Sequence, residues 1–268
     1  PMIAMVFGNK SRKYYHDHKL IFIGLLNLKS ANNTTPEISV LLYHQIGETV
    51  YSHSNLDCLC LVGNFYEQMK YLKNNNYRVI GLNEALSSLH GHNTLDGPTV
   101  VLTFDDGDIS FLELALPILQ EFKFHSVVFA VSGFLGQHAH WIKEPKNRMR
   151  IMSAVQLQSL AMHLVEIGSH SVTHSKLTQL NEKEIRQELY NSKSYLEDII
   201  GNEVASFAYP HGCYNDTVLK TIMTVGYRCA VTCKPDQANN APSFFEIPRK
   251  YITYQDNIEA FSKKLSSN

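Results

Sequence analysis

Short apolar runs alternate with longer amphipathic segments through most of the chain. Runs of four to six residues rich in Val, Ile and Phe predict buried strands, while apolar residues three or four positions apart predict helices. The expected strands cover residues 38–43, 77–80, 99–104, 126–131, 165–169, 205–209 and 228–232, with 245–252 as an eighth candidate. The expected helices cover 64–75, 84–89 (capped by Asn83), 109–122 (bent or interrupted by Pro117), 153–163, 181–200 and 215–225.

This order of elements predicts the fold class. Strands that alternate with helices form parallel sheets joined by right-handed crossovers. Seven or eight such units in one domain, spanning residues 37–268, predict an α/β fold, an irregular, TIM-like (β/α) barrel. In such barrels the active site lies at the carboxyl ends of the strands.

Residues 1–36 read as an N-terminal extension or signal-like segment ahead of that domain. A turn-rich stretch, Asn32-Asn33-Thr34-Thr35-Pro36, separates the two. The apolar run 20–26 follows several basic residues, as the core of a signal peptide does, and is too short to span a bilayer. A signal and a plain extension both remain open, and we favour the cell envelope or a secreted location over the cytoplasm.

Composition and net charge argue against several classes of protein. The 268 residues are 44% hydrophobic and 18% charged with a net charge of −1, so no broad basic field indicates a nucleic-acid partner. The five cysteines contain no paired Cys-x-x-Cys modules, which argues against a structural zinc ribbon and a disulfide scaffold. The oligomeric state is left open by the sequence.

The strand at 99–104 runs directly into Asp105-Asp106-Gly107. Two adjacent carboxylates repel each other, and a bound cation offsets that cost. One carboxylate then ligates the ion while the other is free to act as a base. The alternative is a strand end followed by a turn with solvated aspartates, because Asp and Gly both favour turns.

A second candidate ligand pair follows the strand at 165–169. His170 and His174 are four residues apart, so on a helical turn both imidazoles reach one ion. We therefore expect Asp106, His170 and His174 to hold a divalent metal, which leaves positions open for water and substrate. Asp105 is the expected general base for the attacking water, and His44, at the end of the first strand, is the expected acid.

These residues resemble the motifs of the polysaccharide deacetylases (NodB-homology proteins, carbohydrate esterase family 4). The resemblance rests on Thr103-Phe104-Asp105-Asp106-Gly107, His170-Ser171-Val172-Thr173-His174, Leu41-Leu42-Tyr43-His44, the stretch 207–212 and Ile247-Pro248-Arg249. It covers roughly residues 38–252. It implies an irregular (β/α) barrel, a divalent metal that is usually Zn²⁺, and hydrolysis of N-acetyl groups on an amino-sugar polymer. The N-acetylated glycan is then the expected substrate.

The Tyr43-His44 pair is similar to a branch that includes bacterial poly-N-acetylglucosamine deacetylases, in which the acid histidine precedes the acidic motif. The stretch 207–212 corresponds to the third motif of the family. It departs from the family pattern, because Ala208 and His211 stand where many members carry Arg and Tyr. We hypothesise that Arg249 orients Asp105 in place of that missing arginine. Tyr209, Pro210 and His211 remain the candidates for substrate and oxyanion contacts, with the His211 backbone N–H as the donor.

Two other functions stay open at this stage. An O-acetyl esterase would use the same ion and water, and the altered third motif is compatible with an inactive homologue that binds glycan. Trp141, the one tryptophan, is a candidate either for stacking on a sugar ring or for packing within its loop.

Overall fold

The computed structural model describes residues 37–52 and 54–266. The expectation for residues 1–36 therefore lies outside the described residues. The strands are β1 (Ile38–Tyr43), β2 (Gln45–Gly47), β3 (Leu59–Leu61), β4 (Arg78–Ile80), β5 (Thr99–Phe104), β6 (Ser126–Ala130), β7 (Val165–Ser169), β8 (Ser206–Ala208), β9 (Cys229–Val231) and β10 (Lys250–Tyr251). The α-helices are α2 (Val62–Asn74), α3 (Leu82–Leu89), α4 (Leu116–Phe122), α5 (Ala154–Ser159), α6 (Glu182–Ile200), α7 (Asp216–Val225) and α8 (Ile258–Ser266).

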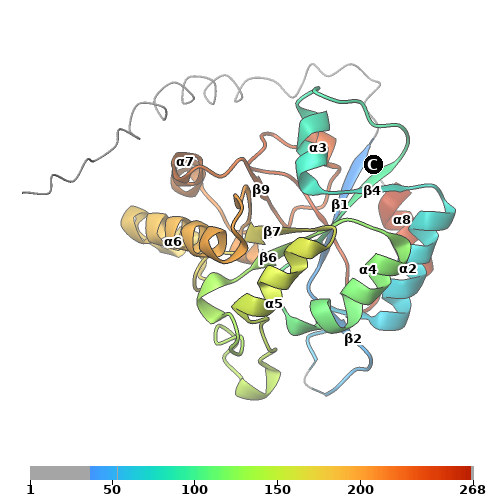
Figure 1. The fold of residues 1–268 in the computed structure, drawn as a ribbon, viewed down its shortest axis with the longest axis horizontal. Helices are drawn as coiled ribbons and strands as arrows, with labels where there is room; N and C mark the ends of the chain where they lie inside the picture. Colours follow the sequence, from blue (N-terminus) through green and yellow to red (C-terminus); the bar gives the residue numbers. More distant parts are fainter. Residues whose placement is uncertain (1–36, 53, 267–268) are drawn as a thin grey trace, which may run out of the picture.

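Eight of these strands form one parallel sheet, which confirms the predicted fold class. The order along the sheet is β10-β1-β5-β6-β7-β8-β9, and β4 pairs with β5 beside this path. The edge of β5 opposite β1 is shared, since residues 99–101 pair with β4 and residues 103–104 with β6. This shared edge makes the barrel irregular, and Figure 1 shows the helices arranged around the strands.

The barrel is closed by the segment that leads into β10. Ile247 forms a parallel bridge with Val231 of β9, and three residues later Lys250 pairs with Leu41 of β1. One short segment therefore contacts both ends of the sheet. The predicted eighth strand at 245–252 is real, but only Lys250 and Tyr251 extend the sheet as β10.

Two apolar clusters lie on opposite faces of the strands. The larger one joins Leu102 and Phe104 of β5 to the inner sides of α2, α4, α5, α6, α7 and α8. The smaller one includes Val101 and Phe129 and continues onto α3. Because side chains alternate along a strand, Thr103 and Asp105 continue the face of Val101, inside the barrel.

Local signals set several boundaries correctly. Asn181 caps α6 through a capping box with Glu184, and Gly201 ends this helix in a left-handed conformation at φ 70°. Asn215 caps α7 by accepting the backbone N–H of Val218, and Ser153 caps α5 through a capping box with Gln156. The helix predicted to continue to His163 becomes a 3₁₀ turn after Ser159.

Other sequence predictions were wrong. Gln45–Gly47 lies outside the expected strands, but it forms β2 and pairs in parallel with β3. Asn83 is not a helix cap, because α3 begins at Leu82 with Gly81 at the cap position. The side chain of Asn83 instead donates to Glu166 of β7, at 3.0 Å from Nδ2 to Oε2.

The interruption expected at Pro117 takes a specific form. Residues Phe111–Ala115 form a π-helical turn, and α4 starts immediately after it with Pro117 in its first turn. A proline in the first turn removes no helical hydrogen bond, so the helix restarts rather than bends. Among the described residues, no helix combines the length and apolarity needed to cross a membrane.

Candidate active site

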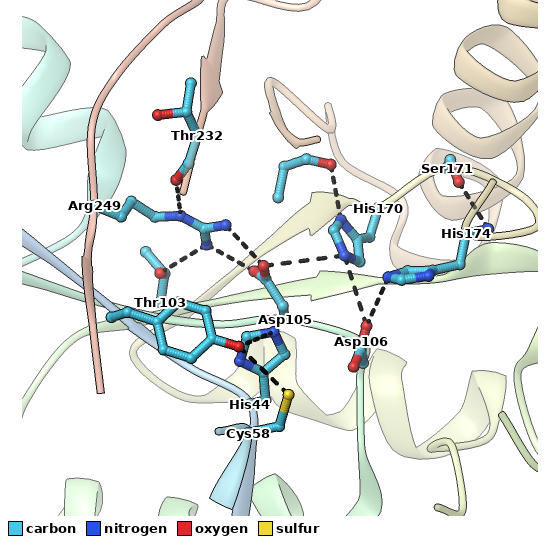
Figure 2. A network of polar contacts seen from close by, with 12 residues as sticks. His44, Cys58, Thr103, Asp105, Asp106, His170, Ser171, His174, Thr232 and Arg249 are labelled. Carbon is cyan, nitrogen blue, oxygen red and sulfur yellow. Dashed lines mark hydrogen bonds and ion pairs between the residues drawn. The ribbon is translucent and has the colours of Figure 1, made fainter. Parts of the chain in front are cut away.

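The candidate site lies at the carboxyl ends of the parallel strands, as the barrel architecture predicts. His44 follows β1, Asp105 and Asp106 follow β5, and His170 follows β7. Figure 2 shows these side chains converging from different strands on one region. Residues far apart in the sequence therefore come together because parallel strands present their carboxyl ends at the same edge.

Asp106 and the two imidazoles form a compact group of donor atoms. The Nε2 atoms of His174 and His170 lie 3.3 and 3.6 Å from Asp106 Oδ1. One ligand atom from each of the three residues lies within 4.8 Å of the others. All three residues are buried, and Asp106 and His174 are the more exposed, with 6% and 9% of their side-chain surface accessible.

The chemistry of this group fits a divalent cation. Among the described residues, Asp106 Oδ1 makes no hydrogen bond and has only the two imidazole nitrogens near it, and a buried carboxylate oxygen is costly unless it is paired. Burial lowers the pKa of His170 to about 4, so its imidazole is neutral and has a lone pair for a metal. Burial opposes ionisation of Asp106, yet the His174 imidazole, 3.3 Å from its carboxylate, lowers its pKa below the usual range.

The His170–His174 segment is a loop, and the predicted helical turn was wrong. Ser171 and His174 both have left-handed backbone angles, with φ of 67° and 60°. Glu188 of α6 stabilises this loop by accepting the backbone N–H groups of Val172 and Thr173, each at 2.9 Å. The sequence analysis missed Glu188, because its spacing from the histidines carries no recognisable signal.

Asp105 lies beside the donor group, with Oδ2 4.0 Å from His170 Nε2, but its closest contacts are with Arg249. Its carboxylate accepts two hydrogen bonds of 2.7 Å from the fully buried guanidinium of Arg249. Burial alone would raise the pKa of Asp105, but the Arg249 charge, with His170 and the Arg249 hydrogen bonds, lowers it. This carboxylate is therefore ionised and has a fixed orientation.

Arg249 is itself held by three other groups. Its Nε donates to the carbonyl of Thr232 at 2.8 Å, and its Nη1 donates to Thr103 Oγ1 at 3.1 Å. The guanidinium also lies over the ring of Phe129, 5.6 Å from its centroid. The structure thus places Arg249 against Asp105, in the location that the sequence hypothesis requires.

His44, which follows β1, contacts Tyr251. Its Nε2 is 3.5 Å from the hydroxyl of Tyr251, which is 3.4 Å from Cys58 Sγ. Its Nδ1 is buried and has no hydrogen-bond partner in the part of the chain that the structure describes. Burial lowers the pKa of His44, while the charges of Asp106 and Asp105 act in the opposite direction. Tyr251 and Cys58 are site neighbours that the sequence analysis did not identify.

Of the third-motif residues Tyr209, Pro210 and His211, His211 contacts His174. His211 packs its ring edge-on to His174, with centroids 4.6 Å apart, and has a left-handed φ of 58°. Tyr209 is fully buried and its hydroxyl donates to the carbonyl of Phe245 at 2.9 Å. Pro210 is buried as well, so neither of these two side chains is exposed.

Comparison with known proteins identifies the family. The family model described as polysaccharide deacetylase matches residues 92–230, about half of the chain. The chain belongs to the polysaccharide deacetylase family. That match includes Asp105, Asp106, His170, His174 and the third-motif stretch.

Individual proteins that resemble this chain share about a quarter of its residues. The Bacillus subtilis protein YxkH, which bears the name of a polysaccharide deacetylase, is 24% identical over 86% of this chain and 77% of its own length. A poly-β-1,6-N-acetyl-D-glucosamine N-deacetylase of Staphylococcus aureus is 26% identical over 70% of this chain, and the match spans 66% of that protein. The Streptococcus pyogenes deacetylase PplD, solved with acetate, has a similar fold, with a TM-score of 0.77 at 23% identity over 87% of this chain and all of PplD.

Proposed function

We propose that this polysaccharide deacetylase family member is a metal-dependent hydrolase that removes N-acetyl groups from an amino-sugar polysaccharide and releases acetate. The observation that carries the proposal is the division between two neighbouring aspartates. Asp106 Oδ1 lies 3.3 and 3.6 Å from two imidazole nitrogens, whereas Asp105 is paired with Arg249 and approaches only His170 Nε2, at 4.0 Å.

Asp106, His170 and His174 would hold the cation, and Zn²⁺ suits two imidazoles and one carboxylate. When bound, such an ion polarises the substrate carbonyl and makes water more acidic. Asp105 then accepts the proton of the attacking water, since its carboxylate is ionised and oriented by Arg249. The third-motif backbone, including His211, would donate to the developing oxyanion.

The leaving nitrogen must gain a proton before the amine departs. His44 is the candidate donor, because it follows β1 at the same edge of the barrel and the two aspartate charges favour its protonated form, against the lowering of its pKa by burial. The Arg249–Asp105 pair also bears on the inactive-homologue alternative. The arginine missing from the third motif is compensated by one from another segment, which supports a working site.

The substrate is proposed from the relatives. A Staphylococcus aureus relative is named for the deacetylation of poly-β-1,6-N-acetyl-D-glucosamine, and we propose an N-acetylated glycan of this class here. The test is acetate release from β-1,6-linked N-acetylglucosamine polymer, chitin oligomers and peptidoglycan, each with and without a chelator. An O-acetylated glycan assayed in parallel separates the amidase from the esterase.

Chelator-sensitive acetate release from an N-acetylated polymer is the expected result. Release from the O-acetylated glycan alone would favour the esterase. Glycan binding without acetate release in the presence of added Zn²⁺ would favour the binding homologue. Release that a chelator does not affect would contradict the metal-dependent mechanism.

A further inference from the structure

The two candidate imidazole ligands are oriented in different ways. His170 Nδ1 lies 2.7 Å from the carbonyl oxygen of Ala208, and this hydrogen bond fixes both the ring and its tautomer. His174 Nδ1 is buried and has no hydrogen-bond partner within residues 37–52 and 54–266. A metal-ligating histidine usually donates its second ring N–H to an acceptor. Other contacts must therefore orient the ring of His174.

Aromatic rings surround His174 instead. The indole of Trp141 stacks on its face, with ring centroids 4.8 Å apart and an interplanar angle of 25°. The rings of His170 and His211 meet it edge-on, at 4.8 and 4.6 Å and with an angle of 68° in both cases. Of these three rings, Trp141 is the one that covers a face of the His174 imidazole. Rotation of the imidazole would break this stack.

Trp141 can serve this purpose because its own loop is braced. Its ring packs against Phe134, with centroids 5.4 Å apart. Arg148 stabilises the residues that follow it, because Nε donates to the carbonyl of Ile142 at 2.8 Å and Nη2 donates to that of Lys143 at 3.4 Å. The backbone N–H of Ile142 donates to the carbonyl of Ala139 at 3.0 Å. These hydrogen bonds fix the backbone before and after Trp141.

We propose that Trp141 is a positioning residue for His174, and that its indole face takes the place of the missing hydrogen bond. The proposal rests on the proposed metal site. An imidazole bound to a cation is polarised toward positive charge, and the indole face is the most favourable aromatic surface for such charge. The stack therefore stabilises the metal-bound state of His174 more than the free state.

The test measures Zn²⁺ affinity by competition with a chromophoric chelator, without substrate. We expect Trp141→Ala to bind Zn²⁺ about 10-fold or more weakly, the scale seen when a partner of a metal ligand is removed. Trp141→Phe keeps an aromatic face and should retain most of the affinity. Trp141→Leu keeps apolar bulk without that face and should be weakened like Trp141→Ala. Tyr190→Ala, which removes a 57% exposed ring from α6, is the matched control and should bind normally.

Circular dichroism of each variant checks the fold, and the absorption of Co²⁺-loaded protein reports on the ligand geometry. Weaker binding by Trp141→Ala and Trp141→Leu, with rescue by Trp141→Phe, supports the proposal. Unchanged Zn²⁺ affinity in both variants, with a raised KM for the glycan, overturns it and leaves Trp141 as a sugar contact. Wild-type protein that binds no divalent metal overturns the proposed function and this inference with it.

Discussion

Arg249 donates from two nitrogens to the two oxygens of Asp105, with both distances at 2.7 Å, and the residues are 144 positions apart in the chain. Such bidentate pairs fix the plane of a carboxylate as well as its charge. The pair is buried on both sides, with 0% and 2% of the two side chains exposed. It holds the proposed base in one orientation next to the proposed metal ligands.

Arg249→Lys should keep a positive charge but lose the two-pronged contact. We expect kcat to fall by about 100-fold while Zn²⁺ affinity stays within a few fold, because Asp106 and the histidines are untouched. Arg249→Ala should also lower the free energy of unfolding by about 3–5 kcal/mol, since it leaves a buried carboxylate unpaired. Steady-state kinetics and urea denaturation measure the two effects. Normal kcat in Arg249→Lys would show that charge alone suffices.

Asp105→Asn and Asp106→Asn form a matched pair of neighbouring substitutions. Asp105→Asn should retain metal and lose turnover, because the amide cannot accept the proton of the attacking water. Asp106→Asn should lose metal affinity, because a charged ligand becomes neutral. Metal content by mass spectrometry and acetate release together distinguish the two. If the variants exchanged these phenotypes, the assigned roles would be reversed.

His170→Ala should weaken Zn²⁺ binding by at least about 10-fold, since it removes a candidate ligand. The second ring nitrogen of this histidine, Nδ1, is already hydrogen-bonded to the carbonyl of Ala208, so the ring is held in place. Calorimetric titration of Zn²⁺ into the variant measures this. His163→Ala, in the turn after α5, is the histidine control, and it should bind as the wild type does. Equal binding by His170→Ala would remove His170 from the site.

His44→Ala should slow acetate release by about 100-fold or more and leave metal affinity unchanged, because the residue is proposed to donate a proton and not to ligate. Single-turnover kinetics with the polymer, beside Zn²⁺ titration, separates these quantities. Full activity in this variant would mean that the leaving group takes its proton elsewhere.

Glu166 predicts a pH effect far from the site. Burial raises its pKa to about 7, above the unfolded value, although Asn83 donates to it. The folded state therefore holds this proton more tightly, and stability is full below about pH 4.5 and falls as the pH rises through 7. Glu166→Gln should flatten this part of the stability profile. Thermal denaturation between pH 4.5 and 8 measures it, and equal slopes for both proteins would refute the prediction.

Much of the barrel could be predicted because its signals are local. Apolar runs mark strands such as β5 and β6, and capping residues such as Asn181 mark helix starts. Strand ends then predict where Asp105 and His170 lie. The errors arose where tertiary context decides. The three residues of β2 carry no strand pattern and become a strand only by pairing with β3.

The contacts around the site show the same limit. Glu188 and Tyr251 act through side chains that arrive from distant segments, so no spacing in the sequence links them to His174 or His44. The left-handed backbone at His174 likewise depends on its contacts with Ser171 and its neighbours rather than on the histidine itself. The altered third motif pointed toward Arg249, but only the closed barrel shows the contact.

The segment that joins β9 to β1 also bears Arg249. Asp105 is synthesised long before its guanidinium partner, 144 positions earlier in the chain. The orientation of the base thus depends on a long-range contact, which the chain can make only once residue 249 is present. A nascent or C-terminally truncated chain that stops short of residue 249 lacks the group that orients this carboxylate, which ties hydrolytic competence to completion of the fold.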